Sequence, residues 1–149
     1  MSESDLVRLY SGRILALAAD IPHLGRLESP QASIRRRSPL CGSTVTVDLD
    51  MADGRVQRFA QDVKACALGQ AAASVVGSVI IGRSAGELAQ ARDALHAMLK
   101  EGAPPPGPPF DGFEVLQPAR EFRNRHASLL LAIEAAAEAA TVAAGRDSA

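Results

Sequence analysis

Two cysteines, Cys41 and Cys66, are the residues of this chain with the most evident chemistry. Cys41 stands in RRRSPLCGSTVTVDLDMADG (residues 35–54), between a basic run and a stretch of alternating apolar and polar residues. A thiolate is a nucleophile and a ligand for zinc or iron, so two thiolates that meet could carry sulfur or share a metal. The alternative for each is a small buried apolar residue, which is a common fate of free cysteine.

The elements around the cysteines predict that the two sulfurs meet. Alternation from Thr44 onward predicts a half-buried strand, ADG (52–54) is a turn signal, and residues 55–63 return as the partner strand. The outer ends of paired strands lie side by side, which brings Cys41 and Cys66 to one edge of the sheet. A helical pattern over 67–81 begins directly after Cys66, and the positive end of a helix favours a thiolate.

The remaining patterns predict one domain over residues 1–149 with an α+β fold. A small three-stranded antiparallel sheet is expected to pack on four to five helices. The further elements are a helix over 2–19 capped by Ser2, a short edge strand over 32–37, a helix over 84–100 that starts at the capping box SAGE, a Pro-rich surface connection over 102–109, a last helix over 127–143 and a flexible tail over 144–149.

Composition and charge narrow the function classes. The 16 basic and 17 acidic residues leave a net charge of −1, which argues against nucleic acid as a partner. No run reaches the roughly 18–20 uninterrupted apolar residues of a membrane span, and MSESDLVRLY has acidic residues where a signal peptide is basic. The sequence therefore predicts a cytoplasmic protein without a membrane partner, in which cysteines are thiols or metal ligands rather than a structural disulfide.

The order of motifs along almost the whole chain resembles one family, the iron–sulfur cluster scaffolds of the NifU N-terminal, IscU and SufU type. Family members show Cys-Gly-Asp on the hairpin, a second cysteine that opens a helix and a third at the start of the last long helix. The long spacing from Cys66 to the last helix is similar to the SufU subtype. The matching segments are LYSGRIL, PHLGRLESP, SPLCGSTVTVDLDMADGRV, ACALGQAAASVVGSVIIGRS and FEVLQPAREFRNRHASLLLAIEAA.

The chain departs from the family at two ligand positions. Ser43 replaces the aspartate after Cys-Gly, and the third cysteine is missing. An ungapped alignment puts Ser128 at the third-cysteine position and keeps Arg125 on the family arginine, as a supporting residue. A gap of two residues would put His126 there, and imidazole is a good ligand for zinc or iron. We favour the ungapped register, with His126 within one turn of the site.

The resemblance implies a carrier rather than an enzyme. A cysteine desulfurase would pass persulfide sulfur to Cys41 or Cys66, and apo-proteins would receive it. Cys41, Cys66 and His126 are three metal ligands at most, whereas a [2Fe–2S] cluster or a closed zinc site takes four. We expect a labile zinc site, a transient cluster, which a homodimer could share, or no cofactor. The alternative is a degenerate member that binds or regulates assembly partners without metal.

Overall fold

A three-stranded antiparallel sheet forms one side of the protein in the computed structural model, which describes residues 11–39 and 42–147. Its strands are β1 (Ala32–Arg37), β2 (Thr44–Ala52) and β3 (Arg55–Lys64), in the order β1–β2–β3. Between β2 and β3, Asp53 and Gly54 have φ angles of 53° and 76°. A two-residue hairpin of the type I′ kind needs positive φ at both central residues, which Asp-Gly supplies. The predicted hairpin and edge strand are confirmed.

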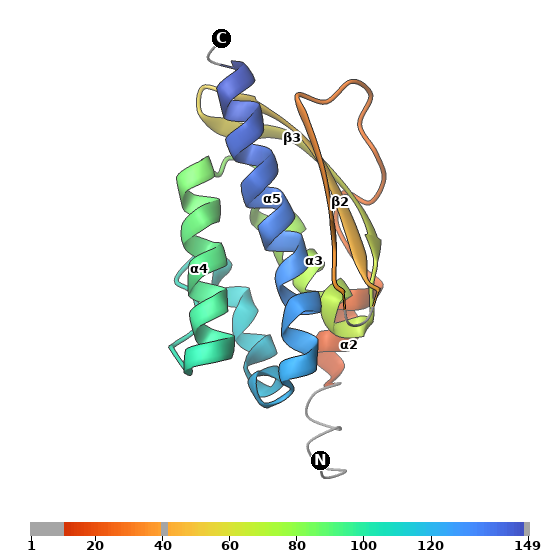
Figure 1. Cartoon of the computed structure of the whole chain (residues 1–149), viewed down its shortest axis with the longest axis vertical. Coiled ribbons are helices and arrows are strands. Elements are labelled where there is room, and N and C mark those ends of the chain that lie inside the picture. Colours follow the sequence, from red (N-terminus) through yellow and green to blue (C-terminus); the bar gives the residue numbers. More distant parts are fainter. Residues whose placement is uncertain (1–10, 40–41, 148–149) are drawn as a thin grey trace.

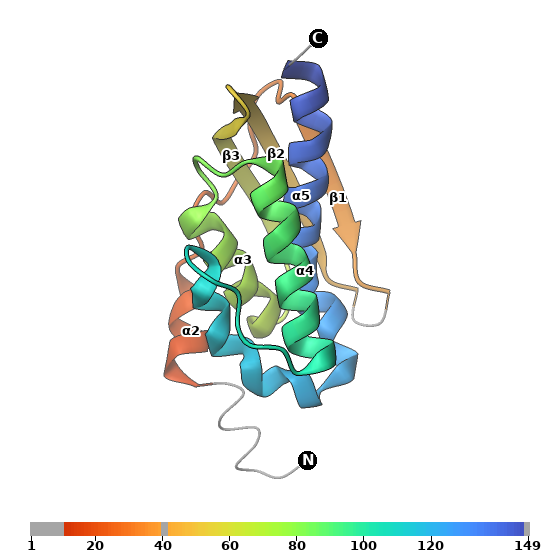
Figure 2. The ribbon, with the colours of Figure 1, turned by 90° about the vertical axis from the view of Figure 1, so that its left-hand side faces the viewer.

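Two helices cover the inner face of the sheet (Figures 1 and 2). α5 (His126–Asp147) lies against β1 and β2, and α3 (Ala67–Val79) lies against β3 and α5. Further from the sheet, α4 (Ala85–Glu101) packs on α5, and α2 (Gly12–Ala19) packs on α3. The α+β architecture predicted from the sequence, with helices on one face of a small antiparallel sheet, is confirmed.

Alanine dominates the surfaces where α3 and α5 meet each other and the sheet. A methyl side chain lets two helices approach closely, while the larger Leu68, Leu129 and Ile133 fill the remaining core volume. This close approach brings the first turn of α3 beside the N-terminal part of α5 (Figure 1). The almost fully buried alanines of these two helices are Ala71, Ala72, Ala73, Ala132, Ala135, Ala136, Ala137, Ala139, Ala140 and Ala143.

The start of α4 is the capping box that the sequence predicts. The Ser84 hydroxyl accepts a hydrogen bond from the Glu87 N–H at 3.1 Å, and the Glu87 carboxylate accepts one from the Ser84 N–H at 3.1 Å. Two N–H groups that lack a helical partner are satisfied in this way. At the other end, Gly102 closes the helix in the left-handed conformation.

Three segments differ from the sequence prediction. Helix α2 begins at Gly12 with Ser11 as its cap; the first part of the predicted 2–19 helix, including Ser2, lies outside the described residues. Helix α5 continues through residues 144–147, which the sequence placed in a tail. The 3₁₀ helix η1 (Phe110–Glu121) and the short η2 (Arg123–Arg125) were not predicted at all.

The η1 segment escaped prediction because its apolar period is that of a 3₁₀ helix rather than an α-helix. Its buried side chains recur every third residue, and Pro118 lies inside it. A 3₁₀ helix has three residues per turn, so these side chains share one face toward the core. They are Phe110, Phe113, Leu116 and Ala119; Val115, outside this period, is also buried.

By length and composition, the helical stretch Arg123–Arg146 is apolar enough to cross a membrane. Its most apolar window is 67% buried inside the molecule. The stretch contains α5, whose contacts with the sheet on one side and α4 on the other account for this composition. We therefore interpret α5 as the core helix of the domain.

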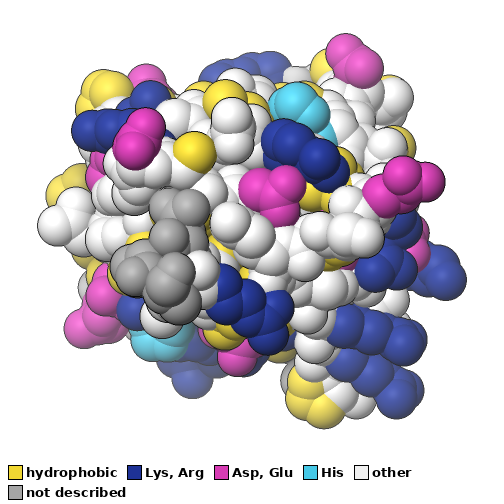
Figure 3. Space-filling model, turned by 90° about the horizontal axis from the view of Figure 1, so that it is seen from above, with side chains coloured by type: hydrophobic (Ala, Val, Ile, Leu, Met, Phe, Trp, Pro, Cys, Tyr) yellow, Lys and Arg dark blue, Asp and Glu magenta, His cyan; other side chains and the backbone are white. Residues whose placement is uncertain are grey.

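Basic side chains collect on the sheet side of the molecule, as the view down its long axis shows (Figure 3). The edge strand β1 contributes Arg35 and Arg37, which are exposed. Arg36 instead lies 3.8 Å from carboxylates of both Glu134 and Glu138 on α5. Charged side chains on an edge strand disfavour pairing with another sheet, which is a sufficient reason for this run.

Candidate functional site

Three segments that are far apart in the sequence meet at one end of the sheet. Ser43 precedes β2, Cys66 connects β3 to α3, and Ser128 lies in the first turn of α5. Antiparallel pairing of Thr44 with Lys64 sets the start of β2 beside the end of β3. The hairpin register therefore determines that Ser43 and Cys66 reach the same end of the sheet.

Side-chain contacts join these three residues in a row. The Cys66 Sγ lies 3.6 Å from the Ser128 Oγ, and the Ser128 Oγ donates a hydrogen bond to the Ser43 Oγ at 3.2 Å. Ser128 is 1% exposed and Ser43 is 5% exposed, whereas Cys66 is only partly buried. Cys66 is thus the member of this group with solvent-accessible surface, and the two serines that accompany it are buried.

Cys66 occupies the N-cap position of α3. Its backbone is extended, with φ −67° and ψ 171°, and its carbonyl accepts the first helical hydrogen bond from the Gln70 N–H at 2.9 Å. The sulfur makes no capping hydrogen bond, so the first N–H groups of the helix are not neutralised by this side chain. The positive end of the helix stabilises negative charge there, on a thiolate or on a persulfide.

His126 is buried at the start of α5, but its ring contacts other residues than Cys66. The Nε2 atom lies 3.2 Å from the carbonyl oxygen of Ala119 and 3.0 Å from that of Arg120, and Nδ1 lies 3.5 Å from the Lys100 Nζ. The two carbonyls require a proton on Nε2, which leaves Nδ1 to accept from Lys100. Burial, and then the charge of Lys100, lower the pKa of His126.

Both ring nitrogens of His126 are therefore engaged away from the site. Ser128, not His126, is the residue beside Cys66, which agrees with the ungapped register. Arg125, the expected supporting residue, ends η2, where its N–H donates to the Phe122 carbonyl at 2.9 Å.

Cys41 lies outside the described residues, so its meeting with Cys66 remains a prediction. The residues on either side of it are fixed by backbone hydrogen bonds. The Ser38 N–H donates to the Ser43 carbonyl at 2.8 Å, and the Gly42 N–H donates to the Ser38 carbonyl at 3.0 Å. Gly42 has a φ of 71°, a conformation that suits glycine.

The described residues at this end of the sheet offer few metal ligands. Within residues 11–39 and 42–147, no group of three or more His, Cys, Asp or Glu side chains could hold a metal ion. The two hydroxyls that accompany Cys66 are neutral and are poor ligands compared with a thiolate or a carboxylate. The described part of the site can therefore supply one good metal ligand, Cys66.

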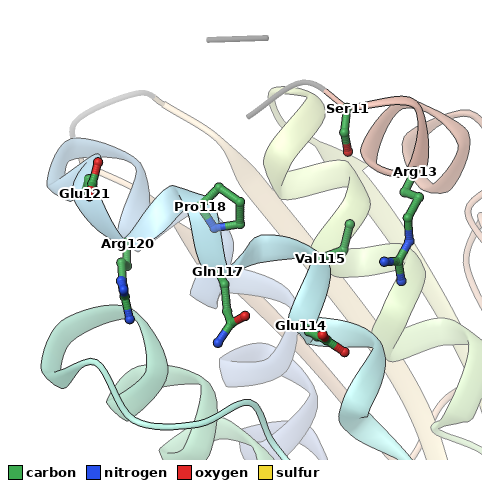
Figure 4. Close-up of a pocket in the computed structure, with 8 residues that line it drawn as sticks. All are labelled: Ser11, Arg13, Glu114, Val115, Gln117, Pro118, Arg120 and Glu121. Atoms are coloured by element: carbon green, nitrogen blue, oxygen red, sulfur yellow. The ribbon is translucent and has the colours of Figure 1, made fainter. Parts of the chain in front are cut away.

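A second feature, a hollow of about 470 Å³ between the start of α2 and η1, lies apart from these residues (Figure 4). Its wall mixes both signs of charge, from Arg13, Arg120, Glu114 and Glu121. Figure 4 shows these side chains pointing in different directions rather than toward one point. We assign the hollow no part in the site.

Comparison with known proteins identifies the family, although no family model and no curated protein matches the chain. The N-terminal part of a nitrogen-fixing NifU-like protein from Brucella abortus is 44% identical in sequence, and its crystal structure superposes with a TM-score of 0.92. The match covers 95% of this chain and 99% of that one. The chain belongs to the NifU-like N-terminal family.

More distant structures share the NifU-like fold. An iron–sulfur cluster assembly scaffold protein for the SUF system from Fervidobacterium islandicum is 18% identical, with a TM-score of 0.79 over 90% of this chain and 98% of that one. A hypothetical protein is 21% identical, with a TM-score of 0.78 over 91% and 98%. The family resemblance drawn from the sequence motifs is confirmed.

Proposed function

We propose that this NifU-like protein acts in iron–sulfur cluster assembly, as a scaffold or sulfur acceptor, and that Cys66 is the thiol that receives sulfur. One observation carries the proposal. Cys66 begins a core helix at the end of the sheet and contacts Ser128, whose hydroxyl bonds to Ser43. These serines stand at the two positions where the family resemblance places ligands, and the same resemblance implies that Cys66 belongs to the site for sulfur and iron.

The sulfur donor in this proposal is a cysteine desulfurase that carries a persulfide on its own cysteine. The Cys66 thiolate attacks the outer sulfur of that persulfide, the donor S–S bond breaks, and the donor cysteine leaves as a thiolate. A new S–S bond forms on Cys66, with no net oxidation or reduction. When the sulfur is anionic, the single O–H of Ser128 turns from the Ser43 oxygen to the sulfur and donates to it, and the N-terminus of α3 stabilises the charge.

Iron or a cluster would be cargo in this scheme. Two thiolates, from Cys66 and Cys41, are fewer than the four ligands that a [2Fe–2S] cluster takes. The proposed holding state is therefore labile, with the remaining ligands supplied by the cargo, by an apo-protein acceptor or by a second copy of the chain. Such a carrier is not an enzyme, and we place it in the cytoplasm.

A second candidate function has one observation in its favour. Because the described residues contain no three-ligand group, the protein could have kept the fold and lost the metal. It would then bind or regulate assembly partners. The metal content of the purified protein distinguishes this partner-binding role from the scaffold or sulfur-acceptor role.

The test is the iron, zinc and acid-labile sulfide content of protein purified without added metal, and again after incubation with iron and sulfide. The proposal expects metal or sulfide that is retained by the wild type and lost in Cys66→Ser. Ser78→Ala is the control, because Ser78 is exposed near the end of α3. If the wild type retained neither metal nor sulfide in both conditions, the scaffold role would be wrong and the partner-binding role would be favoured.

A further inference from the structure

Gly69 is the residue of α3 that lies closest to the Ser128 side chain. A Cβ atom built on Gly69 would stand 2.8 Å from the Ser128 Oγ, 3.3 Å from the Ser128 carbonyl oxygen and 2.8 Å from the Ala65 Cβ. Carbon and oxygen atoms that are not bonded to each other do not approach to 2.8 Å without displacement. The space in which the Ser128 hydroxyl sits is therefore the space that a side chain at position 69 would take.

Position 69 has no conformational reason to be glycine. It lies inside α3, with an ordinary helical backbone, and glycine costs a helix about 0.5–1 kcal/mol relative to alanine. The residues around it are mostly alanines, so alanine suits the rest of this helix. The close approach of Ser128, and of the Ala65 methyl group, is the feature of the structure that explains the exception.

We propose that Gly69 is a positioning residue of the site, which holds the Ser128 hydroxyl between the Cys66 sulfur and the Ser43 hydroxyl. The inference rests on the proposed function, because it concerns the same thiol. With a side chain at position 69, Ser128 must rotate or α5 must move away, and the 3.6 Å and 3.2 Å contacts are lost. The sulfur would then lose the hydroxyl that can donate to its anionic form.

The test is the alkylation rate of Cys66 by iodoacetamide in the full chain, followed by mass spectrometry of the Cys66 peptide at pH 7 and pH 10. Gly69→Ala and Ser128→Ala are each expected to slow alkylation at pH 7 by roughly fivefold, the worth of one hydrogen bond. At pH 10, which is above the ordinary pKa of about 8.5 for a free thiol, the difference should shrink. The double variant should be no slower than either single one.

Gly86→Ala is the matched control, because a Cβ at this helical glycine meets no atom closer than 3.9 Å. Its alkylation rate should equal that of the wild type. If Gly69→Ala does not fold, Ala65→Gly combined with Gly69→Ala removes the contact with Ala65 and leaves the one with Ser128.

Two results would overturn the inference. Faster alkylation of the Gly69→Ala protein at both pH values would mean that the substitution only loosens the core. An unchanged rate in Ser128→Ala would mean that the hydroxyl does not assist the sulfur. Neither reading depends on a desulfurase or on iron, so the experiment fails or succeeds independently of the proposed function.

Discussion

Ser128 shows at the scale of one residue what separates this chain from the family pattern. Its hydroxyl lies 3.6 Å from the Cys66 sulfur, where the resemblance places a third cysteine. A neutral hydroxyl can donate its O–H to an anionic sulfur, but its oxygen binds iron or zinc poorly. In the proposed function, serine at position 128 therefore favours holding sulfur on Cys66 over holding a metal between several ligands.

Restoring ligands should increase metal retention. Ser43→Asp together with Ser128→Cys is expected to raise the iron and sulfide that remain after gel filtration by about tenfold or more, because two good ligands are added beside Cys66. The gain from Ser128→Cys alone should exceed that from His126→Cys, since the His126 ring faces Ala119 and Arg120. A larger gain from His126→Cys would contradict the placement of Ser128 in the site.

His126 should make the fold sensitive to mild acid. Its pKa is lowered by burial and by Lys100, with Arg123 adding in the same direction, so the folded state binds a proton less readily than the unfolded chain. Stability is then complete above the unfolded pKa of about 6.5 and falls as the pH drops below it. Urea midpoints at pH 7.5 and pH 5.5 should therefore differ in the wild type.

The difference between the two midpoints should shrink in His126→Gln, whose amide can still donate to the two carbonyls. His96→Gln is the control, because His96 is exposed on α4. An equal loss of stability in the wild type and in His126→Gln would show that another group carries the acid sensitivity.

At the scale of elements, the sequence predicts best where a local rule and the tertiary structure agree. The Asp-Gly turn determines the hairpin, and the Ser84–Glu87 box determines the start of α4. Helix η1 was not predicted, because its three-residue apolar period and internal proline match neither an α-helix nor a strand. The sequence prediction ended the last helix at residue 143, whereas α5 continues to Asp147. No residue before Gly145 is a helix terminator, so the sequence did not define this end.

The capping box gives an element-scale prediction. Ser84→Ala removes the hydroxyl that accepts from the Glu87 N–H and should cost about 1 kcal/mol, or about 2–4 °C in the melting temperature. Ser78→Ala should change stability much less, because its exposed hydroxyl bonds to the Val75 carbonyl within its own helix. Differential scanning calorimetry of both variants measures this, and equal losses would contradict the capping argument.

Over the whole molecule, the arrangement of helices and strands is that of the NifU-like N-terminal family. The TM-score of 0.92 to the Brucella abortus structure shows that the hairpin, α3 and α5 keep their arrangement. The motif order made the family and the end of the sheet predictable from the sequence. The contact of Gly69 with Ser128 was not predictable, because it depends on how closely two helices approach and not on a motif.

The proposed role of Cys66 as a sulfur acceptor can be measured by sulfur transfer to the protein. The chain is incubated with a cysteine desulfurase and free cysteine. The mass of each cysteine-containing peptide is then measured by mass spectrometry, before and after reduction. We predict one added sulfur atom on the Cys66 peptide, removed by reductant and absent from Cys66→Ser, with Ser78→Ala behaving as the wild type. No added sulfur on Cys66, or unchanged uptake of sulfur by Cys66→Ser, would contradict the claim.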